Sequence, residues 1–252
     1  MNPARLVFLG SGSAFTGAGN WQSNMLLESP GGRRLLIDCG GDIRFSLAEQ
    51  GLGPRDIDAV YVSHLHADHV GGLEWLAFTN HFGPTRRRPV LFAAPEIADA
   101  LWNHCLRGGM ELNGEGRADL STYFQVETSA SGFEWDGTPF RLVPVRHVAG
   151  GGACMPAYGL RFPLNGRQVL LTTDACFQPD ALAGHLETAD LVFHDCETAP
   201  HPSGVHAHYR ELVTLPLALK RRMWLYHHQG GALPDARADG FLGFVAKGQV
   251  FA

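Results

Sequence analysis

The sequence has few of the features that mark several common classes of protein. Its 252 residues include only five cysteines, and none of them forms a CxxC pair. This argues against a disulfide framework or a zinc ribbon. No segment approaches the length needed to cross a bilayer, and the N-terminal segment lacks the long apolar region of a secretory leader. We therefore expect reduced thiols, no membrane contact and a cytoplasmic location.

Basic charge is also scarce. The chain has 20 Lys and Arg against 25 Asp and Glu, which gives a net charge of −5. Tight binding of long nucleic acid depends on many contacts from Lys and Arg to phosphates, so we do not expect such a partner. The composition, 45% hydrophobic and 18% charged, is typical of a globular protein. The length suits one domain over residues 1–252 with a sizeable core.

Short apolar runs, typical of strands, alternate with segments that have helical periodicity. Strands are expected at 5–10, 24–28, 33–40, 57–64, 89–95, 140–147, 157–162, 167–175, 189–197, 222–228 and 244–252. Helices are expected at 42–51, 71–82, 96–106 and 208–220, and a loop at 107–117. This order predicts an α+β fold with two mixed sheets packed face to face and helices outside.

Polar residues gather where the expected strands end. The segment "SHLHADHVGG" at 63–72 places three histidines and an aspartate directly after a buried strand. The complete set of such residues is His64, His66, Asp68, His69, His147, Asp174, Asp195 and His227. Because strand ends are rigid, we expect these side chains to converge at one edge of the sheets.

Imidazole and carboxylate groups together suit zinc and similar divalent metals. After a strand, His64 and His66 can point to one side while Asp68 and His69 point elsewhere, so one segment can serve two ions. Asp174 ends an apolar strand, and a bridging role would explain its position. With His147 and His227, the seven residues form two sets of four that share one carboxylate, as two zinc ions require. His228 remains an alternative to His227.

The motif "HLHADH", followed by a lone His, a strand-terminal Asp and a late His, resembles the metallo-β-lactamase superfamily. The segments "FLGSGSAF" and "LLIDCG" resemble its ribonuclease Z-like branch. The resemblance covers essentially the whole chain and implies a four-layer αββα sandwich with the site at one edge. It implies one metal held by His64, His66, His147 and Asp174, and a second held by Asp68, His69, Asp174 and His227. The expected cofactors are two Zn²⁺ ions, with Mn²⁺ as an alternative.

The same branch has a catalytic histidine that is supported by an acidic residue. Here "FHDCET" resembles the acidic motif and places Asp195, while "GVHAHY" supplies His206 or His208. The distance to His227 favours His206 as the general acid that protonates the leaving oxygen, with Asp195 fixing its tautomer. The implied reaction is hydrolysis of a phosphodiester by a hydroxide held at the metals, where Asp68 also belongs to the catalytic set.

The interval between His147 and Asp174 has no room for the long Gly/Pro-rich arm that ribonuclease Z proper uses to grip transfer RNA. This departure and the acidic charge favour a small substrate. The segments "DIRFSL", "GGLEWLAF" and "MWLYHH" resemble the anti-Pycsar cyclic-nucleotide phosphodiesterases. That resemblance implies cleavage of cyclic nucleotides by a homodimer. Three alternatives stay open: a ribonuclease Z-like tRNA 3′-processing endonuclease, a thioester or lactone hydrolase, and a nucleotide-binding protein without turnover.

Overall fold

A computed structural model describes residues 2–252 of the chain. Two mixed sheets of seven strands each account for most of its β structure. In spatial order the first sheet consists of β16 (Val250–Phe251), β1 (Arg5–Phe8), β2 (Met25–Glu28), β3 (Arg34–Ile37), β4 (Ala59–Tyr61), β5 (Val90–Ala93) and β6 (Gln125–Thr128). The second consists of β15 (Gly243–Phe244), β14 (Met223–Tyr226), β13 (Leu191–Asp195), β12 (Arg167–Leu171), β11 (Tyr158–Leu164), β8 (Thr138–Pro144) and β7 (Gly132–Trp135).

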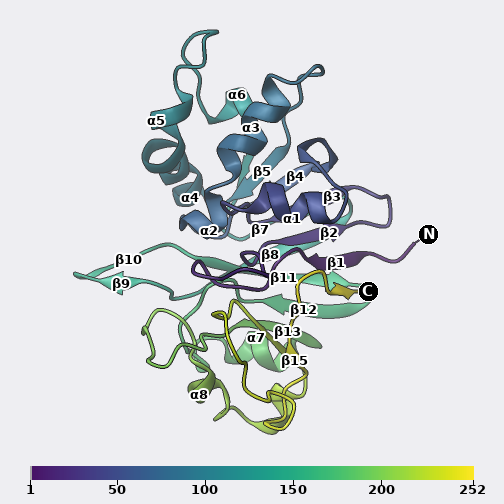
Figure 1. Cartoon of the computed structure of the whole chain (residues 1–252), viewed down its shortest axis with the longest axis vertical. Coiled ribbons are helices and arrows are strands. Elements are labelled where there is room, and N and C mark those ends of the chain that lie inside the picture. Colours follow the sequence, from purple (N-terminus) through teal and green to yellow (C-terminus); the bar gives the residue numbers. More distant parts are fainter. Residues whose placement is uncertain (1) are drawn as a thin grey trace.

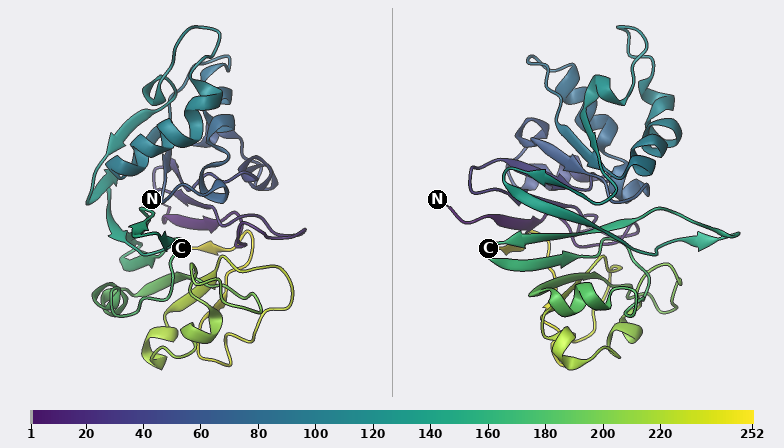
Figure 2. Two further views of the ribbon diagram at one scale, coloured as in Figure 1. Left: turned by 90° about the vertical axis from the view of Figure 1, so that its left-hand side faces the viewer. Right: turned by 180° about the vertical axis from the view of Figure 1, so that it is seen from behind.

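The helices lie on the outside of the two sheets (Figures 1 and 2). On the first sheet lie α1 (Ile43–Glu49), α2 (Ala67–Val70), α3 (Leu73–His81), α4 (Pro95–Ala100), α5 (Arg107–Met110) and α6 (Leu120–Tyr123). On the second lie α7 (Ala183–Thr188), α8 (Tyr209–Leu212) and α9 (Leu217–Lys220). A short 3₁₀ turn, η1 (Pro54–Asp56), and a π-helical turn, η2 (Leu101–Leu106), complete the helical set. The predicted αββα sandwich is confirmed.

Alternation along the strands explains the layers. Leu6 and Phe8 of β1 belong to the core between the two sheets, whereas Val7 packs under the helices of the first sheet. Successive strand residues point to opposite faces, so a strand that is covered on both sides reads as a continuous apolar run. A third core, which includes Leu186 of α7 and Leu212 of α8, fills the space between the second sheet and its helices.

Strand direction places the polar residues at one edge. β3, β4, β5 and β6 are parallel, as are β12, β13, β14 and β15. β8 is antiparallel to β11, which is antiparallel to β12, so β8 runs in the same direction as β12. The carboxyl ends of β8, β12, β13 and β14 therefore share an edge. A hydrogen bond from Tyr158 N–H to Ser63 O (3.1 Å) joins this edge to the end of β4.

Several predicted elements differ in detail. The helix expected at 208–220 is two short helices, α8 and α9, because Pro216 has no N–H to continue a helix. The loop expected at 107–117 begins with α5. The last expected strand, 244–252, is interrupted by a turn between β15 and β16. Strands β6 and β7 were not anticipated.

A hairpin of β9 (Ala149–Gly150) and β10 (Ala153–Cys154) was also not anticipated; it projects from the molecule (Figure 1). Its two-residue turn has positive φ at Gly151 and Gly152 (59° and 82°), a conformation that glycine adopts readily. Within residues 2–252, no helix is both long enough and apolar enough to span a bilayer.

Candidate metal centre

The strand-end residues converge into two groups at the shared edge. His64, His66, His147 and Asp174 each offer one ligand atom, and these atoms lie within 4.8 Å of one another. Asp68, His69, Asp174 and His227 form a second group with the same property. Asp174 belongs to both, so the structure brings together all seven residues in the two sets of four that were expected. Asp174 Oδ2 lies 3.2 Å from His69 Nε2 and from His227 Nε2, and 3.7 Å from His64 Nε2 and from His147 Nε2.

The 64–69 segment serves both groups because its backbone changes conformation. It leaves β4 in an extended conformation, and His66 (φ −71°, ψ 152°) stands just before α2. Asp68 and His69 then fall in the first turn of that helix. The change from extended to helical backbone turns His64 and His66 toward His147, and turns the next two ligands toward His227.

The ring nitrogens of the first group face one another. His66 Nδ1 lies 3.2 Å from His64 Nε2 and 3.1 Å from His147 Nε2. The other nitrogen of His147 donates to Val205 O at 2.7 Å, so its Nε2 is left with a lone pair aimed at His66. Three nitrogens directed at one point form a donor set that suits a cation such as zinc.

Buried polar atoms without partners give an independent test of this fit. Within residues 2–252, His69 Nε2 and both carboxylate oxygens of Asp174 are buried and make no hydrogen bond. A buried carboxylate that has lost water and makes no hydrogen bond is costly. These are the same atoms that would bind the ions, so the residues fit a dinuclear centre.

Neighbouring groups hold the ligand rings in place. His69 Nδ1 donates to Asp38 Oδ2 at 2.7 Å, and His227 Nδ1 pairs with Ser23 Oγ at 2.6 Å. His64 Nδ1 pairs with Ser63 Oγ at 3.0 Å. Such contacts fix the tautomer and orient the free nitrogen toward a metal.

Sequence reasoning missed these supporting residues. Asp38 follows β3 with φ of 62°, an uncommon conformation for a residue other than glycine. It also accepts hydrogen bonds from Ser63 N–H (2.8 Å) and Ser63 Oγ–H (2.7 Å). A carboxylate at the end of an apolar strand was available as a signal, as it was for Asp174.

Burial and nearby charges shift the pKa values of the candidate ligand histidines in different directions. Burial lowers the pKa of His227 to about 4 and lowers the pKa of His64 well below its ordinary value. Burial also opposes a charge on His69, yet Asp174, Asp38 and Asp68 raise its pKa well above the ordinary value. The surrounding carboxylates therefore favour positive charge at this position. A divalent cation would supply such charge.

A histidine–aspartate pair, His206 and Asp195, lies against the candidate ligands. His206 Nδ1 lies 2.7 Å from Asp195 Oδ2, which also accepts a hydrogen bond from Ala175 N–H at 2.9 Å. The His206 ring lies 4.8 Å from the His147 ring and 5.0 Å from the His227 ring, measured between centroids. Burial lowers the pKa of His206, but the charge of Asp195 and the hydrogen bond to it outweigh burial and raise the pKa to about 9.

The two alternative histidines have other partners. His208 Nε2 donates to Ala199 O at 2.9 Å, and its Nδ1 accepts from Arg210 N–H at the start of α8. His228 Nδ1 donates to Gln229 O at 3.0 Å, and His228 belongs to neither ligand group. The geometry therefore favours His206 over His208 as the acid and His227 over His228 as the ligand.

A family model described as "Anti-Pycsar protein Apyc1" matches residues 4–251. The chain belongs to this family. It is 37% identical to an anti-Pycsar protein Apyc1 of Paenibacillus harenae, over 87% of this chain and 88% of the relative. Identity to the corresponding protein of Paenibacillus xerothermodurans is 34%, over 96% of this chain and 92% of the relative.

Solved structures agree on the fold. The metallo-β-lactamase fold protein YhfI of Bacillus subtilis superposes with a TM-score of 0.75 at 19% identity, over 100% of this chain and 99% of YhfI. A diphosphatase of the PhnP family gives 0.74 at 24% identity, over 99% and 97%. The short form of human tRNase Z gives 0.70 at 19%, over 98% of each chain. The metallo-β-lactamase fold and the similarity to the ribonuclease Z-like branch are confirmed.

Proposed function

We propose that this protein is a dinuclear metal phosphodiesterase that hydrolyses 3′,5′-cyclic nucleotides to nucleoside monophosphates. The observation that carries the proposal is the pair of ligand groups joined by Asp174, with His206 packed against both. Membership of the anti-Pycsar Apyc1 family supports cyclic nucleotides as substrates. The proposed occupants are two Zn²⁺ ions, with Mn²⁺ as the alternative.

His64, His66, His147 and Asp174 would hold one ion, and Asp68, His69, Asp174 and His227 the other. Two such ions supply Lewis acidity, which lowers the pKa of water and offsets the negative charge of the phosphoryl oxygens. Asp174 keeps the two groups at a fixed separation because it is buried and belongs to both. The supporting contacts from Asp38, Ser23 and Val205 O keep the ligand rings from rotating.

His206 supplies the proton for the leaving oxygen. Its Nδ1–H is held by Asp195, so its Nε2 is the nitrogen free to donate. With a pKa of about 9, His206 carries a proton at neutral pH and can release it as the P–O bond breaks. Asp195 fixes the orientation of the ring and stabilises the protonated form.

The substrate is proposed to be small. The interval between His147 and Asp174 contains only the β9–β10 hairpin, β11 and β12, and the net charge of −5 disfavours a polyanion. We also propose that the protein is cytoplasmic and forms a homodimer. Light scattering during size exclusion would test the homodimer.

The direct test is to incubate the purified protein with a panel of 3′,5′-cyclic and 2′,3′-cyclic nucleotides and to separate the products. We expect 5′- or 3′-monophosphates to form, with two metal ions per chain by elemental analysis. His66→Ala should lose activity, whereas the matched control His201→Ala should not, because His201 is exposed and outside the ligand groups.

Three results would contradict the proposal. Cleavage of precursor tRNA at low enzyme concentration would favour the endonuclease, and turnover of thioesters or lactones with no action on bis-(p-nitrophenyl) phosphate would favour the acyl hydrolase. Tight binding of cyclic nucleotide without product would indicate a binding protein.

A further inference from the structure

The outer face of the second sheet carries two arginines on adjacent strands. Arg141 of β8 and Arg161 of β11 are register partners in the antiparallel ladder. Phe140, Leu142 and Phe162 point into the core between the sheets, so the alternating arginines point away from it. Directly opposite residues on one face have Cβ atoms about 4.5–5.5 Å apart, and like charges at that separation destabilise a sheet.

No carboxylate relieves this repulsion. Within residues 2–252, neither guanidinium forms an ion pair, although Glu134 is exposed on β7 opposite Pro139. The Arg161 guanidinium is held at the end of α7, where it donates to Thr188 Oγ1 (2.7 Å) and Thr188 O (3.1 Å). Arg141 is exposed and makes no side-chain hydrogen bond within the same residues. In a chain with a net charge of −5, two adjacent arginines without a carboxylate partner require an explanation.

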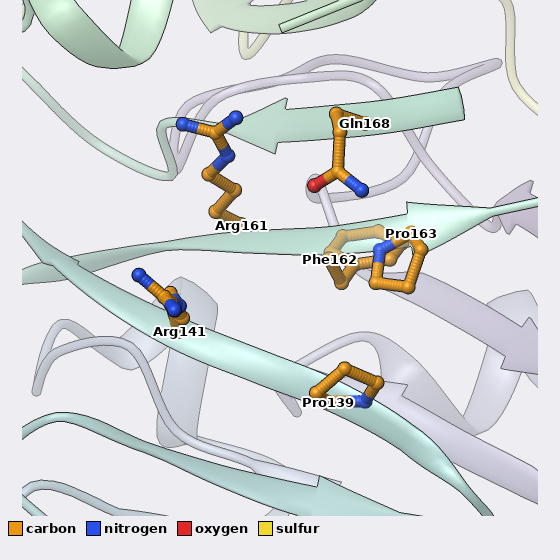
Figure 3. Close-up of a pocket in the computed structure, with 6 residues that line it drawn as sticks. All are labelled: Pro139, Arg141, Arg161, Phe162, Pro163 and Gln168. Carbon is orange, nitrogen blue, oxygen red and sulfur yellow. The ribbon is translucent and has the colours of Figure 1, made fainter. Parts of the chain in front are cut away.

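A cavity of about 410 Å³ opens beside the two arginines. Its lining consists of Pro139, Arg141, Arg161, Phe162, Pro163 and Gln168. Figure 3 shows that the cavity has two different ends: the guanidinium groups lie at one end, and the rings of Pro139 and Pro163 lie at the other. The Gln168 amide projects from the neighbouring strand near the prolines. One end is therefore cationic, and the other is apolar with one amide.

We propose that this face is a second ligand site, which binds a nucleoside monophosphate. The phosphate would lie between Arg141 and Arg161, since guanidinium groups match the geometry of phosphate oxygens and form strong charge-assisted hydrogen bonds. The nucleoside would lie over the two proline rings, within hydrogen-bonding reach of Gln168. An incoming dianion would also remove the repulsion between the arginines. The site shares no residue with the metal centre, so the inference does not depend on what that centre hydrolyses.

Binding of AMP to full-length variants, measured by calorimetry, tests the proposal. In the His66→Ala background, which impairs the metal centre, we expect one AMP to bind per chain. Adding Arg141→Gln should weaken this binding roughly 10–100-fold, as expected for loss of a hydrogen bond to a charged group. Adding Arg221→Gln instead should leave it unchanged, because Arg221 is an exposed arginine outside the cavity. Equal affinity of the Arg141→Gln and parent proteins would overturn the proposal.

Two probes divide the recognition between the ends of the cavity. Inorganic phosphate should bind more weakly than AMP, and adenosine more weakly still. If phosphate binds as tightly as AMP, the proline end contributes nothing and the nucleotide assignment is wrong. If adenosine binds as tightly as AMP, the arginines are not the recognition element and the proposal fails.

A melting experiment separates binding from folding. Without ligand, Arg141→Gln should melt at the same temperature as the parent or above it, because the substitution removes a repulsion. In the His66→Ala background, AMP should raise the melting temperature of the protein that retains Arg141 by more than it raises that of the Arg141→Gln variant. A ligand-free Arg141→Gln protein that melts well below the parent would show that Arg141 stabilises the fold, contrary to the proposal.

Discussion

The two sheets contribute to the proposed metal centre in different ways. The first sheet supplies four ligands from one segment, His64 to His69, at the end of a single strand. The second sheet supplies His147, Asp174 and His227 from the ends of three separate strands, β8, β12 and β14. Closely spaced candidate ligands can be recognised from the sequence alone. Candidate ligands on distant strands can be recognised as one site only when the strand directions place them at the same edge.

Asp174 is the point where the two contributions meet, and its loss should have the largest effect. Asp174→Ala should remove a ligand from both groups, so metal content should fall for both sites and activity should fall to background. Elemental analysis and cyclic-nucleotide turnover check this. Asp180→Ala is the control, because Asp180 is an exposed aspartate in the next loop. Two ions retained by Asp174→Ala would disprove the bridging role.

The general acid should be separable from metal binding. His206→Ala should keep both ions and lose about 10²–10⁴-fold in kcat, the range for loss of general acid catalysis. His208→Ala should retain activity and lose only about 1 kcal/mol of stability, because His208 caps α8. The opposite pattern of activities would assign the acid to His208.

The supporting contacts allow the two sheets to be compared directly. Asp38→Asn removes a charged partner of His69 on the first sheet, and Ser23→Ala removes a neutral partner of His227, the ligand that follows β14. Loss of such a partner typically costs about 10–100-fold in metal affinity. We expect Asp38→Asn to lie at the upper end and Ser23→Ala at the lower end. Asparagine tolerates the positive φ at position 38, so backbone strain should not mask the result. Competition with a chromogenic chelator measures both, and equal losses would contradict the ranking.

The smallest effect concerns pH. His206 must be protonated to act as an acid, and its pKa is about 9, so kcat should be constant near neutrality and fall as pH rises through about 9. Asp195→Asn removes the charge that raises this pKa, so the fall should begin at lower pH. A pH–rate profile of both proteins measures the shift. An alkaline limb that persists in His206→Ala would assign the titration to another group.

The sequence was informative where a property depends on local pattern. Alternating apolar residues and strand-end polar residues predicted the layers and the seven candidate ligands that the structure brings together. The helix expected at 96–106 corresponds to α4 and the π-helical turn η2, whereas its continuation into α5 was not predicted, because glycines at 108 and 109 favour a loop. The separation of α8 from α9 at Pro216 was foreseeable, since proline removes a helical hydrogen bond.

The supporting contacts could not be derived in the same way. Val205 holds His147 through its backbone carbonyl, and any residue type offers such an oxygen. The contact depends on the path of the 199–206 loop, which is set by tertiary packing. Ser23 reaches His227 across 204 positions of sequence, and nothing in its own neighbourhood marks it as a partner of an imidazole.

The shared edge also has a mechanical consequence. The candidate ligands that follow β4 belong to the first sheet, and those that follow β8, β12 and β14 belong to the second. Cations bound between them would therefore cross-link the two halves of the sandwich. Any ligand that binds only the native state shifts the folding equilibrium toward that state. Removal of these cations should therefore weaken the contact between the two sheets before it disturbs either sheet.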